Sequence, residues 1–310
     1  MTAKKLCLAI LGPTASGKTA FAIEVAREIG GEIVCVDSTT VYRGFDIGTS
    51  KPTPEQQALV PHHLLDILAP EQPFNAHDFV AQARAVIQQI QAKGKIPLLV
   101  GGSYFYLRAL QQGMYATGGY DDAALDALTE EFSTEAGLDG SKIHAALSAL
   151  DASGAQALHP NDTYRTLRAL ALARRGLKPS ELQPSEGMGA DWIWLKYAMA
   201  ISRKRLAENI AQRTQAMARD GLADEVRALL QSAPGAKALG SIGYAETVRY
   251  LKDEINEVAW LTQISDNTRQ LLKRQMTWLR SDPELRYVDP GDTARVVLEV
   301  NNLKSVLGIS

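Results

Sequence analysis

The 310-residue sequence has only two cysteines, few aromatic residues and no long apolar segment. Two cysteines exclude a disulfide framework, and both lie in apolar strand-like runs where we expect reduced, buried thiols. No apolar run approaches the roughly 18–20 residues that cross a bilayer. Lys4 and Lys5 precede the apolar run Leu6–Leu11, but this run is too short for a signal peptide core and fits a strand. We therefore expect a cytoplasmic protein without a membrane span.

The sequence also lacks an excess of either charge, with 33 Lys+Arg and 35 Asp+Glu, and it has no internal repeat. A hydrophobic content of 45% excludes a wholly disordered chain. The charges are unevenly distributed, because residues 120–152 are acidic with a single base, Lys142. The stretch from Tyr164 to Lys178 has no acid and carries the bases Arg165, Arg168, Arg174, Arg175 and Lys178. A nucleic-acid backbone as partner and ordinary solvated helix faces both remain open.

Strand-like and helix-like segments alternate over the first hundred residues. Helical spacing predicts helices over Ala20–Ile29 and from the N-cap Asn75 to about Lys93. Short apolar runs predict strands at Leu6–Leu11, Ile33–Val36 and Ile96–Val100. This alternation is typical of an α/β fold in which a parallel sheet is flanked by helices.

From about residue 120 the sequence is dominated by Ala, Leu and charged residues. We expect residues 120–187 to form an inserted all-helical subdomain between the core segments 1–119 and 188–310. Beyond the insertion, the pattern predicts a strand at Trp192–Tyr197, helices at Ser202–Arg219, Leu222–Gln231 and Glu257–Arg280, and a last strand at Arg295–Val300.

The strongest motif lies between the first strand and the first helix. Residues 12–19 are GPTASGKT, which matches the phosphate-binding pattern G-x-x-x-x-G-K-[ST] in its strand–loop–helix context. In this pattern the backbone N–H groups and the helix N-terminus bind an anion, Lys18 reaches the terminal phosphate, and the Thr19 hydroxyl is placed for Mg²⁺. The predicted phosphate-binding residues of this P-loop NTPase-like core are Gly12, Pro13, Thr14, Ala15, Ser16, Gly17, Lys18 and Thr19.

One carboxylate stands out in the core. Proteins that bind nucleoside triphosphates usually hold their metal with an acid after a separate strand, but Ile96–Val100 ends in Gly101-Gly102-Ser103. Asp37 instead closes the strand Ile33–Val36, at the rim where α/β sheets bind ligands. From the residues alone, Asp37 is a metal ligand, a general base or a cap for the residues that follow it.

Seven stretches in a fixed order identify a family. They are GPTASGKT (12–19), VDSTTVYRGFDIGTSKP (36–52), PHHLLDI (61–67), IPLLVGGSYFYLRAL (96–110), HPNDTYR (159–165), IGYAE (242–246) and RQLLKRQMTWLR (269–280). In them the sequence resembles the tRNA dimethylallyltransferases, also called tRNA isopentenyltransferases. The resemblance implies transfer of a dimethylallyl group from dimethylallyl diphosphate to N6 of the adenosine immediately 3′ of the anticodon, with Mg²⁺ as cofactor and diphosphate as product. The sequence has no Cys/His spacing of a zinc finger, and this absence is typical of the bacterial members. We also expect a monomer.

The resemblance also implies roles for single residues. Asp37 is then the general base for the adenine amino group, Ser103 stands near that group in place of a more usual Thr, and Arg203 clamps the diphosphate. Arg213 matches another arginine of the same helix. The predicted catalytic set is Asp37, Thr19, Ser103 and Arg203. The predicted tRNA-binding residues are Asp37, Ser38, Thr39, Thr40, Ser103, Arg165, Arg168, Gly243, Tyr244, Lys273, Arg274, Gln275, Trp278 and Arg280.

Three positions depart from the family pattern: Thr40 replaces a Gln, Asn209 an arginine and Ala245 a Lys. The departures concern the diphosphate clamp and the reading of neighbouring bases, not the transfer chemistry. The adjacent pair His62-His63 is expected to be structural, since neighbouring side chains of a strand point apart. The competing functions are a P-loop kinase of a nucleotide or small metabolite, an AMP-specific isopentenyltransferase, and a non-catalytic tRNA-binding protein.

Overall fold

The structure, a computed structural model, describes residues 4–114, 122–135, 137–189 and 192–308. The chain folds into two compact units, of which the first comprises Met1–Gln111 with Met188–Ser310 and the second Gln112–Gly187. The sequence placed the start of the insertion at residue 120, which lies outside the described residues.

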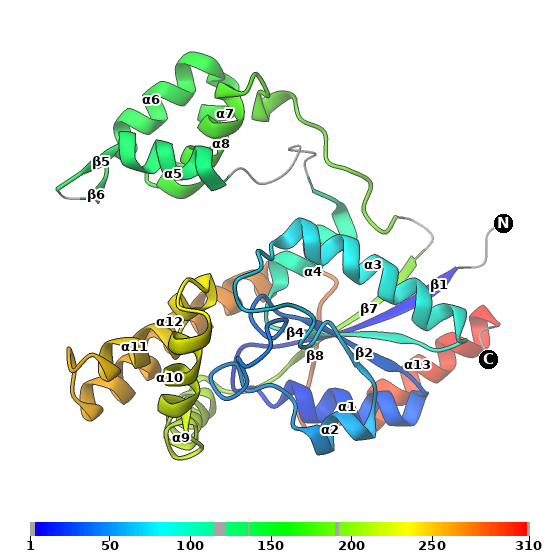
Figure 1. Ribbon diagram of the computed structural model, residues 1–310. Coiled ribbons are helices and arrows are strands. Elements are labelled where there is room, and N and C mark those ends of the chain that lie inside the picture. The colour runs from blue at the N-terminus through cyan, green and yellow to red at the C-terminus, as the bar shows by residue number, and fades with distance from the viewer. Residues whose placement is uncertain (1–3, 115–121, 136, 190–191, 309–310) are drawn as a thin grey trace. The chain divides into compact units, whose positions relative to one another are not determined.

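A six-stranded sheet forms the centre of the first unit, with the order β3-β2-β4-β1-β7-β8 and parallel pairing throughout (Figure 1). The register of β1 with β7 runs from Lys5 opposite Trp192 to Leu11 opposite Ala198. The segments before and after the insertion therefore share one sheet. The strands are β1 (Lys5–Leu11), β2 (Glu32–Val36), β3 (His62–His63), β4 (Pro97–Gly101), β7 (Trp192–Met199) and β8 (Arg286–Val288).

Helices cover both faces of this sheet, as the alternation of side chains along β1 shows. Leu8 and Ile10 pack in one core with the helices α1 (Lys18–Ile29) and α13 (Thr293–Leu307). Cys7 and Ala9 pack in a second core with α3 (Ala76–Ala92) and α4 (Tyr104–Gln112) on the opposite face (Figure 1). Burial on both faces explains why β1 is apolar without interruption from Leu6 to Leu11. Both cysteines are buried and unpaired, as expected.

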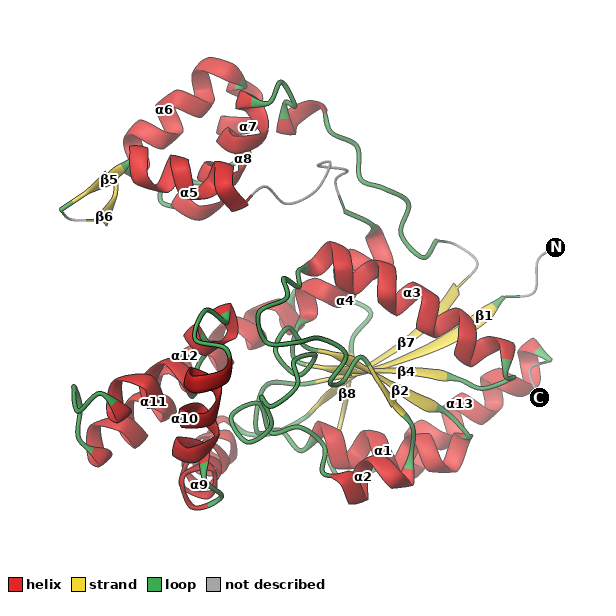
Figure 2. Ribbon diagram, in the orientation of Figure 1, coloured by secondary structure: helices red, strands yellow, loops and turns green. Residues whose placement is uncertain are grey.

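A third core joins the C-terminal helices to the segment after β2. Val41 and Phe45 from that segment pack against buried residues such as Leu222, Tyr244 and Trp260. Figure 2 shows loops gathered between the sheet and these helices. The helices are α9 (Arg203–Arg219), α10 (Leu222–Ser232), α11 (Tyr244–Leu251) and α12 (Glu257–Arg280), with the 3₁₀ turn η2 (Lys237–Gly240) before α11 and the short helix α2 (Pro54–Leu59) after β2.

One predicted element has the wrong secondary structure. Arg295–Val300, predicted as a strand, lies inside helix α13. Val296 and Val300 are both fully buried, and their separation of four residues is the spacing of one helix face. The run Val-Val-Leu between charged residues is too short to distinguish the periodicity of a strand from that of a helix, so the pattern alone did not decide the secondary structure.

The second unit is helical apart from one short hairpin that the sequence did not predict. Ile143, Leu147 and Leu170 form the centre of its core. The buried Asp151 carboxylate accepts hydrogen bonds from Gly154 N and from the amide and hydroxyl of Ser180. The elements are α5 (Asp122–Glu131), β5 (Ser133–Thr134), β6 (Gly137–Leu138), α6 (Gly140–Leu150), α7 (Ala152–Gln156), α8 (Thr163–Arg174) and the 3₁₀ turn η1 (Pro179–Glu181). Among the helices of both units, within the described residues, none is long and apolar enough to cross a membrane.

Candidate active site

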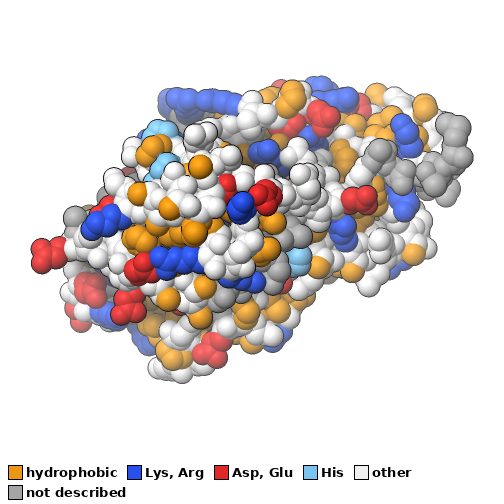
Figure 3. Space-filling model, turned by 90° about the horizontal axis from the view of Figure 1, so that it is seen from above, with side chains coloured by type: hydrophobic (Ala, Val, Ile, Leu, Met, Phe, Trp, Pro, Cys, Tyr) orange, Lys and Arg blue, Asp and Glu red, His pale blue; other side chains and the backbone are white. Residues whose placement is uncertain are grey.

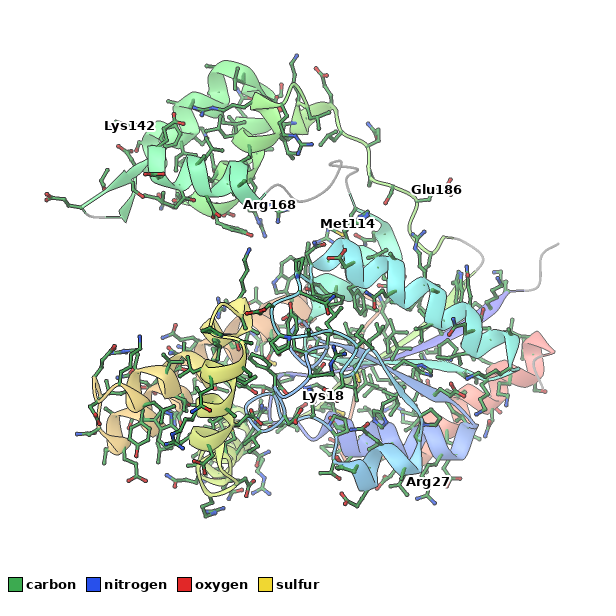
Figure 4. All side chains as sticks on the ribbon, in the orientation of Figure 1. Lys18, Arg27, Met114, Lys142, Arg168 and Glu186 are labelled. Atoms are coloured by element: carbon green, nitrogen blue, oxygen red, sulfur yellow. The ribbon has the colours of Figure 1, made fainter. Side chains whose placement is uncertain are left out.

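The GPTASGKT loop forms an anion-binding cradle between β1 and α1. Ala15 and Gly17 adopt positive φ values of 63° and 78°, which turn the loop tightly. No side chain caps the N-terminus of α1, so the N–H groups of its first turn and the helix dipole are available to an anion. Gly12 is needed for close packing, because a Cβ there would lie 2.6 Å from Ser16 Oγ. Lys18 begins α1 at the cradle, and Arg27 lies in the last turn of that helix (Figure 4).

Two cations and one carboxylate influence one another at the cradle. Burial, and then the charge of Arg213, lowers the pKa of Lys18 to about 8, while Asp37 opposes this shift. Burial likewise lowers the pKa of Arg213, again opposed by Asp37. The Arg213 guanidinium donates a hydrogen bond to Thr14 Oγ1. A site with two desolvated cations gains most when a multiply charged anion binds between them.

Asp37 lies just beyond the end of β2, and its contacts show the capping role that was one of its three predicted roles. Its Oδ1 accepts hydrogen bonds from Thr39 N at 2.8 Å, Thr39 Oγ1 at 2.7 Å and Thr40 N at 3.4 Å, which is a turn-capping arrangement. Its Oδ2 has no hydrogen-bond partner among the residues that the structure describes. One oxygen therefore fixes the side chain, and the other is available to take a proton.

The turn after β4 brings Ser103 to the same rim. Ser103 N donates to Val36 O at 3.3 Å, which places this turn beside the residue that precedes Asp37. Gly101 is required here, since a Cβ would lie 2.0 Å from Val36 O. The double glycine thus allows two strand ends to approach closely.

These elements enclose one cavity of about 820 Å³ within the first unit. The cradle residues from Thr14 to Thr19 line it, together with Asp37 to Thr40 and the turn from Gly101 to Ser103. Ile33, Cys35 and Val100 add a buried apolar wall. The cavity therefore joins an anion cradle, a carboxylate and an apolar surface, which is the combination that a donor with an anionic head and a hydrocarbon tail requires.

The structure distinguishes Arg203, which the resemblance assigned to the diphosphate, from Arg213 of the same helix. Arg213 lines the cavity, whereas Arg203 is exposed in the first turn of α9 and is not among the lining residues. Asn209, which replaces a family arginine, donates from Nδ2 to Ala15 O at 2.9 Å. Arg213 is thus the α9 arginine at the cavity, and Asn209 supports the loop from outside.

The predicted tRNA-binding residues of the first unit fall into two groups. Arg274, Gln275 and Trp278 of α12 line the cavity, and so do Ser38, Thr39, Thr40, Gly243 and Tyr244. Lys273 and Arg280 are exposed on α12 outside this lining. The Tyr244 side chain is fully buried and donates from its hydroxyl to Glu225 Oε1 at 2.7 Å, so the ring supports the wall and offers no free face.

The two predicted tRNA-binding residues of the second unit lie on α8. Arg165 is exposed and pairs with Asp162 at 3.5 Å. The Arg168 guanidinium lies 5.8 Å from the centre of the Tyr164 ring, and Figure 4 shows its side chain on the surface of this unit. On the face of the molecule in Figure 3, basic and acidic side chains are interspersed with hydrophobic ones.

Sequence reasoning missed Glu225 on α10, which organises one wall of the cavity. Its carboxylate accepts hydrogen bonds from the amides of Asp46 at 3.1 Å, Ile47 at 2.7 Å and Gly48 at 3.3 Å. Gly48 is needed for this packing because a Cβ would lie 2.4 Å from the Tyr244 ring. No local motif marks Glu225, since these three amides are more than 170 residues away in the sequence.

The cradle offers hydroxyl groups that fit a divalent cation, provided that a bound anion supplies further ligands. Thr19 lines the cavity, and the buried hydroxyl of Ser16 has no hydrogen-bond partner among the described residues. No group of three His, Cys, Asp or Glu side chains within the described part of the chain could hold a metal alone.

The adjacent histidines have different neighbours. His62 Nδ1 lies 2.7 Å from Val60 O, and His63 Nε2 lies 2.8 Å from Glu32 Oε2.

The chain has extensive similarity to known proteins. The family model described as IPP transferase matches residues 40–282. The tRNA dimethylallyltransferase 1 of Trichlorobacter lovleyi is 41% identical over 289 residues, which cover 92% of this chain and 94% of that protein. The structure of the tRNA isopentenylpyrophosphate transferase from Bacillus halodurans is 30% identical, with a TM-score of 0.68, and the match covers 98% of this chain and 96% of that one.

A more distant structure supports the same fold. A eukaryotic dimethylallyltransferase acting on tRNA is 24% identical with a TM-score of 0.80, and the match covers 97% of this chain and 80% of that one. Both units are thus included in the similarity. The chain belongs to the IPP transferase family, the tRNA dimethylallyltransferases.

Proposed function

We propose that this enzyme transfers a dimethylallyl group from dimethylallyl diphosphate to N6 of the adenosine immediately 3′ of the anticodon of tRNA, with release of diphosphate. The observation that carries the proposal is the cavity of about 820 Å³, onto which the anion cradle and the Asp37 carboxylate both open. The family membership of the chain, established from relatives that bear this name, supports the same reaction.

The cradle is suited to the donor's departing group. In the reaction the bond between the allylic carbon and the diphosphate oxygen breaks, and negative charge builds on the leaving diphosphate. Lys18 and Arg213 line the cavity and the N-terminus of α1 is uncapped, so we assign these groups to the developing charge. Preorganised positive groups of this kind stabilise a transition state more than a ground state, because the charge on the bridging oxygen grows along the reaction.

Asp37 is suited to the acceptor side. The adenine amino group is a weak nucleophile, since its lone pair is delocalised into the ring. As the new N–C bond forms, the Oδ2 atom of Asp37 takes one amino proton, while Thr39 and the Thr40 amide hold Oδ1 in place. The Ser103 hydroxyl, which also lines the cavity, is available to orient the amino group.

Thr19 and the buried Ser16 hydroxyl are the cradle groups that would hold Mg²⁺ together with diphosphate oxygens and water. When bound, the ion adds Lewis-acid stabilisation of the leaving diphosphate. We assign no other resident metal to the site.

The acceptor base must leave its stack to reach this cavity. Bases of a single-stranded loop do so at lower cost than bases of a duplex, which suits an anticodon loop. Lys273, Arg274 and Arg280 on α12, with Arg165 and Arg168 on α8, are the cations that we assign to the RNA backbone. As the resemblance to bacterial members of the family implies, we assign the enzyme to the cytoplasm and expect it to act as a monomer.

A single incubation tests the proposal. Purified protein, Mg²⁺, unmodified tRNA and labelled dimethylallyl diphosphate should yield N6-allylated adenosine in a nucleoside digest and an equal amount of diphosphate. Parallel reactions contain AMP instead of tRNA, and ATP instead of the donor. Labelled AMP in preference to tRNA, or a phosphorylated product from ATP, would contradict the proposal.

A further inference from the structure

The crest of the anion cradle, Thr14 and Ala15, is held by side chains from outside the loop. Thr14 N donates to Gln275 Oε1 at 3.0 Å, and Arg213 donates to Thr14 Oγ1. Asn209 donates to Ala15 O at 2.9 Å. Ala15 has a positive φ of 63°, a backbone conformation that is unfavourable for residues other than glycine. The crest therefore depends on these contacts to keep its shape.

Gln275 is distinctive because it joins two separate walls of the cavity. While its Oε1 accepts from Thr14, its Nε2 donates to Gly102 O at 3.2 Å. Gly102 is fitted to this contact, since a Cβ there would lie 2.5 Å from Gln275 Nε2. One amide thus connects the cradle after β1 with the turn after β4. Gln275 is more than 260 residues from Thr14 and more than 170 residues from Gly102 in the sequence.

Packing beneath these contacts holds α9 and α12 together. Leu206 and Ile210 of α9 form a small buried cluster with Leu272 of α12, and Ala15 and Met276 pack against it. The cradle crest therefore rests on the same helix pair that supplies its hydrogen bonds. A displacement of α12 would move Gln275 and the support under Ala15 at once.

We propose that Gln275 is a positioning residue for the anion cradle and does not contact the RNA. The inference rests on the proposed function, in which the cradle binds the donor's diphosphate. The structure supports this role more directly than the predicted one as an RNA contact, because Oε1 accepts from Thr14 N and Nε2 donates to Gly102 O. Its exposed neighbours Lys273 and Arg274 keep their assignment to the RNA backbone, as does Arg280.

As a consequence, the affinity for the donor depends on the position of α12, the helix that we assign to RNA binding. Gln275→Leu removes both hydrogen bonds and puts a slightly shorter, apolar side chain in place of the amide. Gln275→Glu keeps the acceptor for Thr14 N but places a carboxylate oxygen against the Gly102 carbonyl. We expect either change to raise the KM for dimethylallyl diphosphate by about tenfold, with a smaller effect on kcat and none on tRNA affinity.

The matched control lies on the same helix. Lys273→Ala should raise the Kd for tRNA and reduce the salt dependence of binding, while the KM for the donor stays within about twofold. The measurements are steady-state kinetics with varied donor at saturating tRNA, tRNA binding at two salt concentrations, and titration with inorganic diphosphate. Thermal unfolding shows whether each variant is folded.

Gly102→Ala tests the same contact from the other side, because its methyl group would displace Gln275 Nε2. It should raise the donor KM as Gln275→Leu does, and it serves if a Gln275 variant does not fold. A rise in the Kd for tRNA with an unchanged donor KM in the Gln275 variants would overturn the inference. Failure of the proposed function is distinguishable, since the unsubstituted enzyme would then neither bind the donor nor modify tRNA.

Discussion

The lowered pKa of Lys18 predicts a specific pH dependence for donor use. In the free protein, burial and the neighbouring Arg213 bring this pKa to about 8. The ammonium group that we assign to diphosphate binding is therefore present below pH 8 and is lost as the pH rises above it. At pH 9 about a tenth of the enzyme carries the charge, so kcat/KM for dimethylallyl diphosphate should fall about tenfold for each further pH unit. Below about pH 8 the profile should be flat on this account.

The donor and the second cation do not produce this alkaline limb. The last ionisation of a phosphate group is near pH 6, so the donor's charge is constant above about pH 7. Arg213 keeps its charge over the same range even though burial lowers its pKa, because a guanidinium stays protonated in proteins. The limb should therefore have the slope of a single ionisation.

Initial rates with varied donor and saturating tRNA, from pH 6.5 to about 9.5, measure the profile. Lys18→Arg is the matched variant, since arginine retains a cation throughout this range. Its kcat/KM is expected to be lower, but its profile should lack the limb near pH 8. A flat profile for the unsubstituted enzyme, or the same limb in Lys18→Arg, would refute the assignment of this pKa to Lys18.

Four further substitutions test other parts of the site and the core. Asp37→Asn should lower kcat by about 10²–10⁴-fold with little change in donor KM, because the amide still accepts from Thr39 but takes no proton; steady-state kinetics measure this, and a kcat near wild type would remove Asp37 from the chemistry. Arg213→Ala should raise the donor KM by about tenfold or more, whereas Arg203→Ala should leave it within about twofold; the opposite order would place Arg203 at the diphosphate. Asp282→Asn should lower the free energy of unfolding by about 2–3 kcal/mol, because the buried Lys196 ammonium loses a partner at 2.6 Å; urea unfolding measures this, and a loss below about 0.5 kcal/mol would contradict it.

The elements that local sequence predicts best are those with long or bounded patterns. The anion loop with its flanking strand and helix was predicted because glycine spacing, an apolar run and helical periodicity agree over residues 6–29. Helix α12 was predicted with its observed ends, Glu257 and Arg280, because it spans many turns. Helix α11 was not predicted, since its eight residues offer too short a pattern, and the run within α13 fits a strand as well as a helix.

The roles of the α9 residues could not be predicted from type and position in a motif alone. Arg203 and Arg213 are both arginines of one helix, and only the rotation of that helix against the anion loop decides which one reaches the cavity. Asn209 and Arg213 are four residues apart and hence share a face, and both contact the loop crest. Arg203 precedes Asn209 by six residues, which turns it toward another side of the helix, where it is exposed. The buried Leu206 and Ile210 fix this rotation by packing on Leu272 of α12, so a contact far away in the sequence determines which arginine lies at the cavity.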